Sequence, residues 1–257
     1  MRLGFDLDGT VADMQAALAR EARILFPDLD LSAVPTSPAP DETIPGEASS
    51  TEPQTPPLAS TSPASSGSSS KLTLTSRQHQ ALWKAACARE NFWETLAEIE
   101  PGSLKRLYGL TRQRKWEVLF VTSRPETKGD TAQAQSHRWL VAQGFESPSI
   151  FVAHGSRGKI AAALDLDVIV DDRPENCLDV AIDSKARAIL VWRGGEETVP
   201  ASARQLGIGT VSSISQCLDI LESLDAEPEE GGVVERLKRL LGLKSRDPRA
   251  AASRAGR

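Results

Sequence analysis

The chain has 257 residues, a formal net charge of −5, three cysteines and three histidines. The negative charge argues against stable nucleic-acid or membrane-surface binding by the whole chain, and no apolar run approaches the roughly 18 residues that a membrane-spanning helix needs. The cysteines are far apart and the histidines show no ligand spacing relative to them, which argues against a disulfide framework and a zinc site and indicates a cytoplasmic protein.

The N-terminal third of the chain predicts one strand, one helix and a long segment of low complexity. Residues 2–5 form an apolar run that is typical of a core strand rather than of a signal peptide. Residues 13–26 carry apolar side chains at helical spacing, and Pro27 ends this helix. From about residue 32 to 70, Pro, Ser, Thr and Ala dominate, so this insert cannot bury enough apolar surface to fold and is predicted to be disordered. A partner-binding role is the alternative.

Helices and strands alternate through most of the remaining chain. Helices are predicted at residues 76–89, 91–99, 103–115, 131–143, 159–164 and 174–182, and strands at 118–121, 150–152, 168–170 and 188–192. Repeated strand-then-helix units imply a parallel sheet with right-handed crossovers. We therefore expect an α/β fold, namely a Rossmann-like parallel sheet with helices on both faces.

The same pattern predicts how the chain divides into domains. Residues 1–12 and 101–224 are expected to form the core, and residues 13–100, interrupted by the insert at 32–70, a separate segment inserted after the first strand. Residues 225–257 are expected to form a linker, a short amphipathic helix and a basic tail. A frayed terminal helix with a disordered tail explains this segment, and docking to an acidic partner, a membrane surface or RNA is the alternative.

Polar side chains follow three of the predicted strands at their carboxyl ends. They are Asp6 and Asp8 after the first strand, Thr122, Ser123 and Arg124 after the second, and Asp171, Asp172 and Arg173 after the fourth. Because the carboxyl ends of parallel strands share one edge of the sheet, four carboxylates should converge there and repel one another unless a cation neutralises them. A hard, oxygen-ligated ion such as Mg²⁺ suits this edge. Gly9 would permit the tight turn that brings Asp8 over the site.

An acidic cluster with a bound metal ion is suited to phosphoryl transfer. Asp6 is the candidate nucleophile, because a carboxylate can form an aspartyl phosphate, and Asp8 is the candidate acid that protonates the leaving oxygen and later activates water. Thr122 or Ser123 is expected to hydrogen-bond the phosphate. Lys159, near the start of its predicted helix, is expected to neutralise a phosphate oxygen.

Other polar residues near this edge have more than one interpretation. Arg124 and Arg173 are candidates for binding the substrate phosphate, and solvated ion pairs are the alternative for both. The segment Gly-Ser-Arg-Gly-Lys at residues 155–159 superficially resembles a P-loop, but Ile160 stands where Ser or Thr should bind Mg²⁺. We therefore interpret this segment as the loop that delivers Lys159.

In these residues the sequence resembles the haloacid dehalogenase (HAD) superfamily. The matching segments are Phe-Asp-Leu-Asp-Gly-Thr at 5–10, Val-Thr-Ser-Arg at 121–124, Lys159, and Ile-Val-Asp-Asp-Arg at 169–173. The resemblance covers about residues 1–26 and 90–195. It implies that Asp6 is the nucleophile and Asp8 the general acid and base. It also implies that Thr122 or Ser123 and Lys159 hold the phosphoryl group, and that Asp6, the backbone carbonyl of Asp8, Asp171 and Asp172 bind Mg²⁺. The second Asp of the first motif implies a phosphatase rather than a dehalogenase.

A narrower resemblance concerns the segment before the second motif. Residues 91–102, followed by Val-Thr-Ser-Arg-Pro and a helix carrying Trp139 and Leu140, are similar to the cytosolic 5'(3')-deoxyribonucleotidase family. This resemblance implies that residues 13–100 form a small helical cap, inserted after the first strand, that helps to choose the leaving group. It also implies that residues 1–12 and 101–224 form the catalytic core. Phe92 and Trp93 are candidates for stacking on a nucleobase, and packing into the protein's own core is the alternative. The long insert departs from the family's pattern.

The sequence therefore predicts a Mg²⁺-dependent phosphomonoesterase whose substrate is small and phosphorylated, first of all a (deoxy)nucleoside monophosphate cleaved by a 5'-nucleotidase activity. A HAD phosphatase for sugar phosphates or other small phosphoesters is the alternative. A non-catalytic HAD-like interaction module is a third reading, and the intact charge cluster argues against it.

Overall fold

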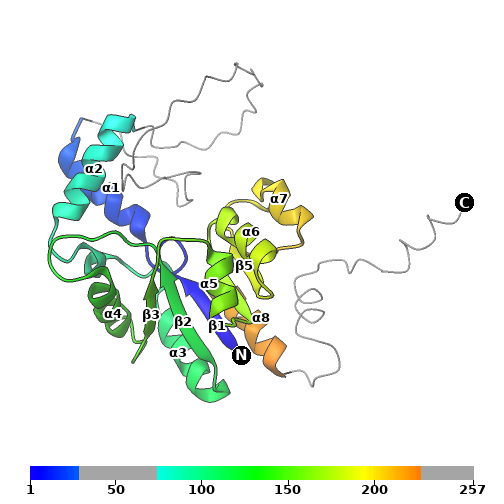
Figure 1. Ribbon diagram of the computed structural model, residues 1–257. Helices are drawn as coiled ribbons and strands as arrows, with labels where there is room; N and C mark the ends of the chain where they lie inside the picture. The colour runs from blue at the N-terminus through cyan, green and yellow to red at the C-terminus, as the bar shows by residue number, and fades with distance from the viewer. Residues whose placement is uncertain (29–73, 227–257) are drawn as a thin grey trace, which may run out of the picture.

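The computed structural model describes residues 1–28 and 74–226 (Figure 1). The insert predicted at 32–70, and the C-terminal segment from residue 227 onward with its predicted amphipathic helix and basic tail, lie outside the described residues. None of the helices in the described ranges combines the length and the apolar character that crossing a membrane would require.

A parallel sheet of six strands forms the centre of the protein, in the order β3-β2-β1-β4-β5-β6. The strands are β1 (Arg2–Asp6), β2 (Glu117–Thr122), β3 (Ser149–Val152), β4 (Val168–Asp171), β5 (Arg187–Val191) and β6 (Gly209–Val211). This confirms the expected Rossmann-like α/β fold. The sequence analysis missed β6, because three residues beginning with Gly are too short to give a recognisable strand pattern.

Helices cover both faces of the sheet, as expected. They are α1 (Met14–Leu25), α2 (Ser76–Ala88), α3 (Ser103–Arg114), α4 (Ala132–Ala142), α5 (Arg157–Ala163), α6 (Pro174–Asp183), α7 (Ala201–Gln205) and α8 (Ile214–Ala226), with the 3₁₀ helices η1 (Phe92–Thr95) and η2 (Glu196–Thr198). Side chains of α3, α4 and α8 share one core with one face of the strands, and side chains of α5, α6 and α7 share a second core with the other face.

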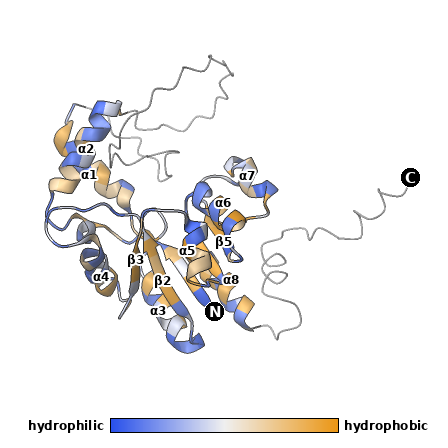
Figure 2. Ribbon diagram, in the orientation of Figure 1, coloured by the Kyte–Doolittle hydropathy of each residue, from blue (hydrophilic) through white to orange (hydrophobic). Residues whose placement is uncertain are grey.

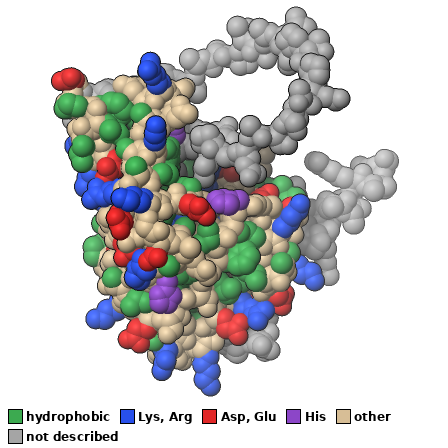
Figure 3. All heavy atoms as spheres, turned by 60° about the vertical axis from the view of Figure 1, so that its left-hand side comes forward, with side chains coloured by type: hydrophobic (Ala, Val, Ile, Leu, Met, Phe, Trp, Pro, Cys, Tyr) green, Lys and Arg blue, Asp and Glu red, His purple; other side chains and the backbone are tan. Residues whose placement is uncertain are grey.

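The central strands are apolar on both faces, as parallel strands between two layers of helices must be. Within β4, Val168 and Val170 belong to the core under α3 and α8, while Ile169 between them belongs to the core under α5 and α6. Figure 2 shows the resulting concentration of hydrophobic residues along the strands. On the outer face drawn in Figure 3, basic and acidic side chains are interspersed.

The segment that follows β1 begins and ends at neighbouring positions in the structure. Ala12 and Glu98 form an antiparallel bridge, and Ile99 N–H donates to the carbonyl of Val11 at 2.9 Å. Between these points α1 and α2 pack together beyond the carboxyl ends of the strands (Figure 1). The last part of this segment, η1, packs against α4. It also contacts α2, since the rings of Trp93 and Trp83 lie with their centroids 6.5 Å apart.

Candidate active site

Three carboxylates meet where β1 and β4 end side by side in the sheet. Asp6 is the last residue of β1, Asp171 is the last of β4, and Asp172 follows it. One oxygen from each lies within 4.8 Å of the others. Their side chains are almost completely buried, with exposed fractions of 7 %, 0 % and 2 %. The parallel sheet thus brings together three of the four carboxylates that the sequence placed at its carboxyl edge, whereas the side chain of the fourth, Asp8, pairs with Arg124.

Burial changes the protonation of this cluster. It raises the pKa of Asp6 well above the usual range, and the neighbouring charge of Asp171 adds to the effect. Burial and the same neighbour raise the pKa of Asp172 to about 8. Since three buried carboxylates cannot all stay charged at neutral pH without a counter-charge, and since all the donors are oxygens, the cluster fits a hard divalent cation such as Mg²⁺.

The turn after β1 brings Gly9 and Thr10 against Asp172. Gly9 has a φ of +85°, and a Cβ at this position would lie 2.2 Å from Oδ2 of Asp172. The hydroxyl of Thr10 donates to Oδ1 of Asp172 at 3.1 Å. The expected tight turn at Gly9 is confirmed, and the close approach is a second reason that only glycine fits there.

Arg157 is the cation that the structure places in the carboxylate cluster. Its side chain is 4 % exposed, and Nη2 donates to Oδ1 of Asp6 at 2.9 Å. Its Nε lies 3.7 Å from Oδ2 of Asp171. Both Nε and Nη1 are buried without a hydrogen-bond partner. A guanidinium with unused N–H groups beside the candidate nucleophile is well suited to receive an oxyanion.

Lys159, the cation that the sequence analysis selected, does not join this cluster. Its side chain is exposed, and among residues 1–28 and 74–226 it makes no ion pair. The sequence analysis expected the helix to begin at residue 159. It begins at Arg157, since the hydroxyl of Ser156 caps it by accepting from the N–H of Lys159 at 3.2 Å.

The packing of α5 explains why Arg157 points inward. A Cβ on Gly158 would lie 2.2 Å from the carbonyl oxygen of Asp179 in α6, so the two helices touch through this glycine. Arg157 and Ala161, four residues apart and therefore on one helix face, are both buried. The order Ser-Arg-Gly-Lys could have indicated this orientation. In it, the arginine stands between a serine that can cap the helix and a glycine that allows close helix packing.

The hydroxyl residues after β2 have different partners. Thr122 is buried, and its Oγ1 donates to Oδ2 of Asp8 at 3.2 Å. Ser123 is half-buried, and its Oγ donates to the carbonyl of Ala153 at 3.0 Å, which ties the end of β2 to the chain leaving β3. Of the two candidates for phosphate binding, Thr122 is the one in contact with an acidic residue of the site.

The two arginines at the edge of the site also differ. Arg124 is fully buried, and all its nitrogens donate to Asp8 or to Ser136. Because its side chain is buried and each nitrogen already has a partner in the protein, the contacts of Arg124 favour an ion pair with Asp8 over a contact with a substrate phosphate. The backbone N–H of Arg173 donates to Oδ1 of Asp171 at 2.9 Å, and its half-buried side chain adds positive charge nearby.

Phe92 and Trp93 are not available to stack on a nucleobase. Each is 1 % exposed, and their rings contact each other edge to face with centroids 5.1 Å apart. The alternative weighed from the sequence, packing into the protein's own core, is the one that the structure shows.

Asn176 and Arg193 contact the site but were not predicted. The amide of Asn176 donates to both oxygens of Asp171 at 3.0 and 3.1 Å. Arg193, just after β5, donates to the carbonyls of Gly9 and Thr10 at 2.6 and 2.9 Å and so fixes the turn. Neither residue lies in a recognisable motif, so only the position after β5 could have indicated Arg193.

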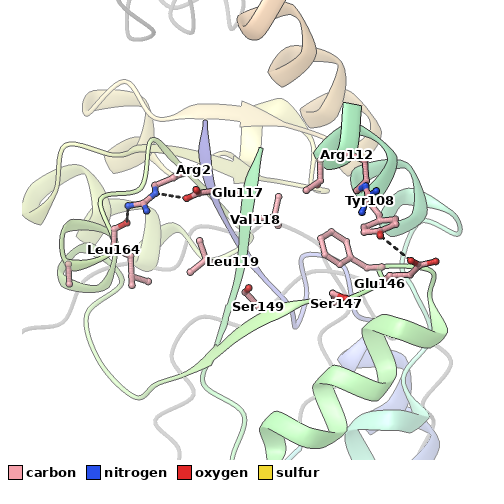
Figure 4. A pocket seen from close by; sticks show the side chains of 13 residues that line it. Arg2, Tyr108, Arg112, Glu117, Val118, Leu119, Glu146, Ser147, Ser149 and Leu164 are labelled. Carbon is pink, nitrogen blue, oxygen red and sulfur yellow. Dashed lines mark hydrogen bonds and ion pairs between the residues drawn. The ribbon is translucent and has the colours of Figure 1, made fainter. Parts of the chain in front are cut away.

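A hollow of about 600 Å³ lies at the opposite edge of the sheet (Figure 4). Its lining includes the first residues of three strands, Arg2, Glu117 and Ser149. Ligands in parallel sheets bind beyond the carboxyl ends of the strands. The hollow therefore lies at the wrong edge to belong to the carboxylate site.

Comparisons with known proteins identify the fold. No protein-family model matches the chain, and a search of curated protein sequences gives no match either. Among solved structures, a hydrolase from Pseudomonas syringae is 17 % identical with a TM-score of 0.46, the alignment covering 89 % of this chain and all of that one. A HAD family hydrolase from Deinococcus radiodurans R1 is 12 % identical with a TM-score of 0.50, covering 86 % and 95 %. This chain thus shares its fold with a HAD family hydrolase.

Proposed function

We propose that the protein is a phosphomonoesterase that uses Asp6 as a nucleophile and Mg²⁺ as its cofactor. The observation that carries this proposal is the position of Asp6, which lies close to two further buried carboxylates and to a buried guanidinium with two nitrogens that have no hydrogen-bond partner. The carboxylates suit a cation and the guanidinium suits an anion, so the groups around the nucleophile are complementary to a phosphate ester with its metal ion. The Deinococcus structure contains bound phosphate and sodium, which supports this substrate class for the shared fold.

The proposed reaction has two halves. In the first, an oxygen of Asp6 attacks phosphorus, the bond from phosphorus to the ester oxygen breaks, and Asp8 gives its proton to the departing alcohol. In the second, water attacks the phosphorus of the aspartyl phosphate, Asp8 takes a proton from that water, and inorganic phosphate leaves with the carboxylate of Asp6 restored. No oxidant or further reactant is needed.

The residues around Asp6 would stabilise the transferring group. The unpaired N–H groups of Arg157 can donate to phosphoryl oxygens in a site from which water is excluded, where such bonds are strongest. The hydroxyl of Thr122 is the second candidate donor, because it already reaches Asp8. A Mg²⁺ ion held by Asp6, Asp171 and Asp172 would supply charge screening between the carboxylate and the anionic substrate.

For the substrate we propose a nucleoside monophosphate, on the sequence resemblance of residues 91–102 alone. Since Phe92 and Trp93 are buried, other residues would have to contact the base. Sugar phosphates and other small phosphoesters are the alternative. Release of phosphate from nucleotides but not from sugar phosphates would separate the two.

The test is phosphate release by the full chain with Mg²⁺ from a panel of nucleoside monophosphates, sugar phosphates and p-nitrophenyl phosphate. Wild type and Asp6→Asn are measured side by side, with and without a chelator. We expect release that depends on both Mg²⁺ and Asp6. Equal release by the two proteins, or none by either across the panel, would contradict the proposed function.

A further inference from the structure

Each nitrogen of the Arg124 side chain donates to a residue of the protein. Arg124 lies two residues after the end of β2, and the exposed fraction of its side chain is 0 %. Its Nε donates to Oδ2 of Asp8 at 2.9 Å and its Nη2 to Oδ1 at 2.7 Å, which makes a two-pronged contact with both carboxylate oxygens. Its Nη1 donates to the hydroxyl of Ser136 at 2.8 Å. The charged guanidinium of Arg124 is thus buried, at a cost in desolvation free energy, in contact with the carboxylate of Asp8.

Two indole rings hold this guanidinium in place. The Cζ of Arg124 lies 4.8 Å from the ring centroid of Trp93 and 5.7 Å from that of Trp139. Each ring is itself tethered, since Nε1 of Trp93 donates to the carbonyl of Pro125 at 3.0 Å and Nε1 of Trp139 to that of Leu96 at 2.8 Å. Cation–π contacts with two tethered rings, together with the hydrogen bonds to Asp8 and Ser136, restrict the position of the guanidinium.

The consequence concerns the two aspartates of the first motif. Asp6 pairs with Arg157 in the carboxylate cluster, whereas Asp8 pairs with Arg124 and receives the hydroxyl of Thr122. Each aspartate therefore has its own arginine. Without Arg124, the hydroxyl of Thr122 would be the one side-chain hydrogen bond, among those described at this site, that restrains the carboxylate of Asp8.

We infer that Arg124 is a positioning residue that holds the carboxylate of Asp8 in place for proton transfer, with Trp93, Trp139 and Ser136 fixing the arginine. This inference rests on the proposed phosphatase function. It assigns Arg124 no contact with the substrate. Its effect on catalysis therefore passes through Asp8.

A double-mutant cycle tests the inference with p-nitrophenyl phosphate and Mg²⁺. Arg124→Met in the wild-type background should lower kcat about 100-fold, within the range for losing a positioned acid and base, with little change in KM. In the Asp8→Asn background the same substitution should lower kcat by less than about threefold, because no acid remains to be positioned. An equal loss in both backgrounds would overturn the inference. A rise in KM with kcat unchanged would also overturn it and restore the substrate-binding role.

A second variant keeps the test decisive if Arg124→Met does not fold. Ser136→Ala removes only the hydroxyl that anchors Nη1, so it should lower kcat severalfold in the wild-type background and leave Asp8→Asn unchanged. Arg138→Met is the matched control, because Arg138 also lies on α4 but pairs with Glu94 and Asp130 on the surface. It should not alter kcat. If wild-type hydrolysis does not require Asp6, both the proposed function and this inference fail. If hydrolysis requires Asp6 but Arg124→Met lowers kcat equally in both backgrounds, the inference alone fails.

Discussion

The two edges of the sheet differ in how far their charged side chains are buried and in how their charges are paired. At the amino edge, Arg2 and Glu117 form an ion pair of 2.6 Å whose side chains remain 48 % and 64 % exposed (Figure 4). At the carboxyl edge, Asp6, Asp171 and Asp172 are buried within reach of one another. Solvent screens the first pair, so it adds little to stability. The second group keeps like charges together at a cost in stability, and sites with that arrangement are commonly functional.

The largest expected effect follows from removing the nucleophile. Asp6→Asn should lower kcat by about a thousandfold or more, as expected when a residue that forms the covalent intermediate is lost. The same change should raise the melting temperature of the metal-free protein at neutral pH, because it removes one of three crowded carboxylates. Steady-state kinetics and thermal denaturation with a chelator measure both. A variant that lost activity and also had a lower melting temperature would contradict the claim that the carboxyl edge holds its charged groups at a cost in stability.

Arg157 and Lys159 form a matched pair for the next effect. Arg157→Met should lower kcat about 100- to 1,000-fold, the range found when one donor to a transition-state oxyanion is removed. Lys159→Met, two residues away on the exposed side of α5, should leave kcat within about twofold of the wild type. The reverse ranking would restore Lys159 as the phosphate-binding cation and remove Arg157 from that role.

The carboxyl edge should also give stability an unusual pH dependence when no metal is bound. Because the pKa of Asp172 is raised to about 8 in the folded protein, the folded state holds more protons than the unfolded state between about pH 4 and 8. The contribution of Asp172 to stability is then present at low pH and is lost as the pH rises through that window. Denaturant unfolding with a chelator should show this decline, and Asp172→Asn should reduce it.

Adding Mg²⁺ provides the control for this pH dependence. The ion binds the deprotonated carboxylates, so it should raise the melting temperature more at pH 8 than at pH 6. An identical shift at both pH values would indicate that the cluster is already ionised without metal, contrary to the raised pKa values of Asp6 and Asp172.

The smallest effect is expected at the amino edge. Glu117→Gln removes the exposed partner of Arg2, and it should leave kcat unchanged and move the melting temperature by less than about 2 °C. Kinetics and thermal denaturation at low and moderate salt are sufficient to check this. A loss of activity would mean that the two edges of the sheet are coupled.

The sequence predicted the parts of the molecule that depend on short, local patterns. The apolar runs predicted the sheet, and Asp6, Asp171 and Asp172 at the ends of two strands predicted the carboxylate cluster. It failed for Arg157, because the choice between an arginine and a lysine two residues apart depends on where a helix begins and which helix face packs inward.

Contacts between residues far apart in the chain could not be predicted from local sequence patterns either. Arg124 lies in a motif, yet only the fold brings Asp8, Trp93 and Trp139 around it. Arg193 reaches the turn at Gly9 from a position 184 residues away in the chain. No local spacing encodes such a contact, since it depends on the order of the strands in the sheet.

The most direct test of the account is to trap the covalent intermediate. The full chain, mixed with Mg²⁺ and p-nitrophenyl phosphate, is quenched during turnover and treated with borohydride, which reduces an acyl phosphate to an alcohol. Peptide mass spectrometry should then find Asp6 converted to homoserine, and no conversion at Asp8, Asp171 or Asp172. Turnover with no modification at Asp6, or with modification at another of these aspartates, would contradict the assignment of Asp6 as the nucleophile.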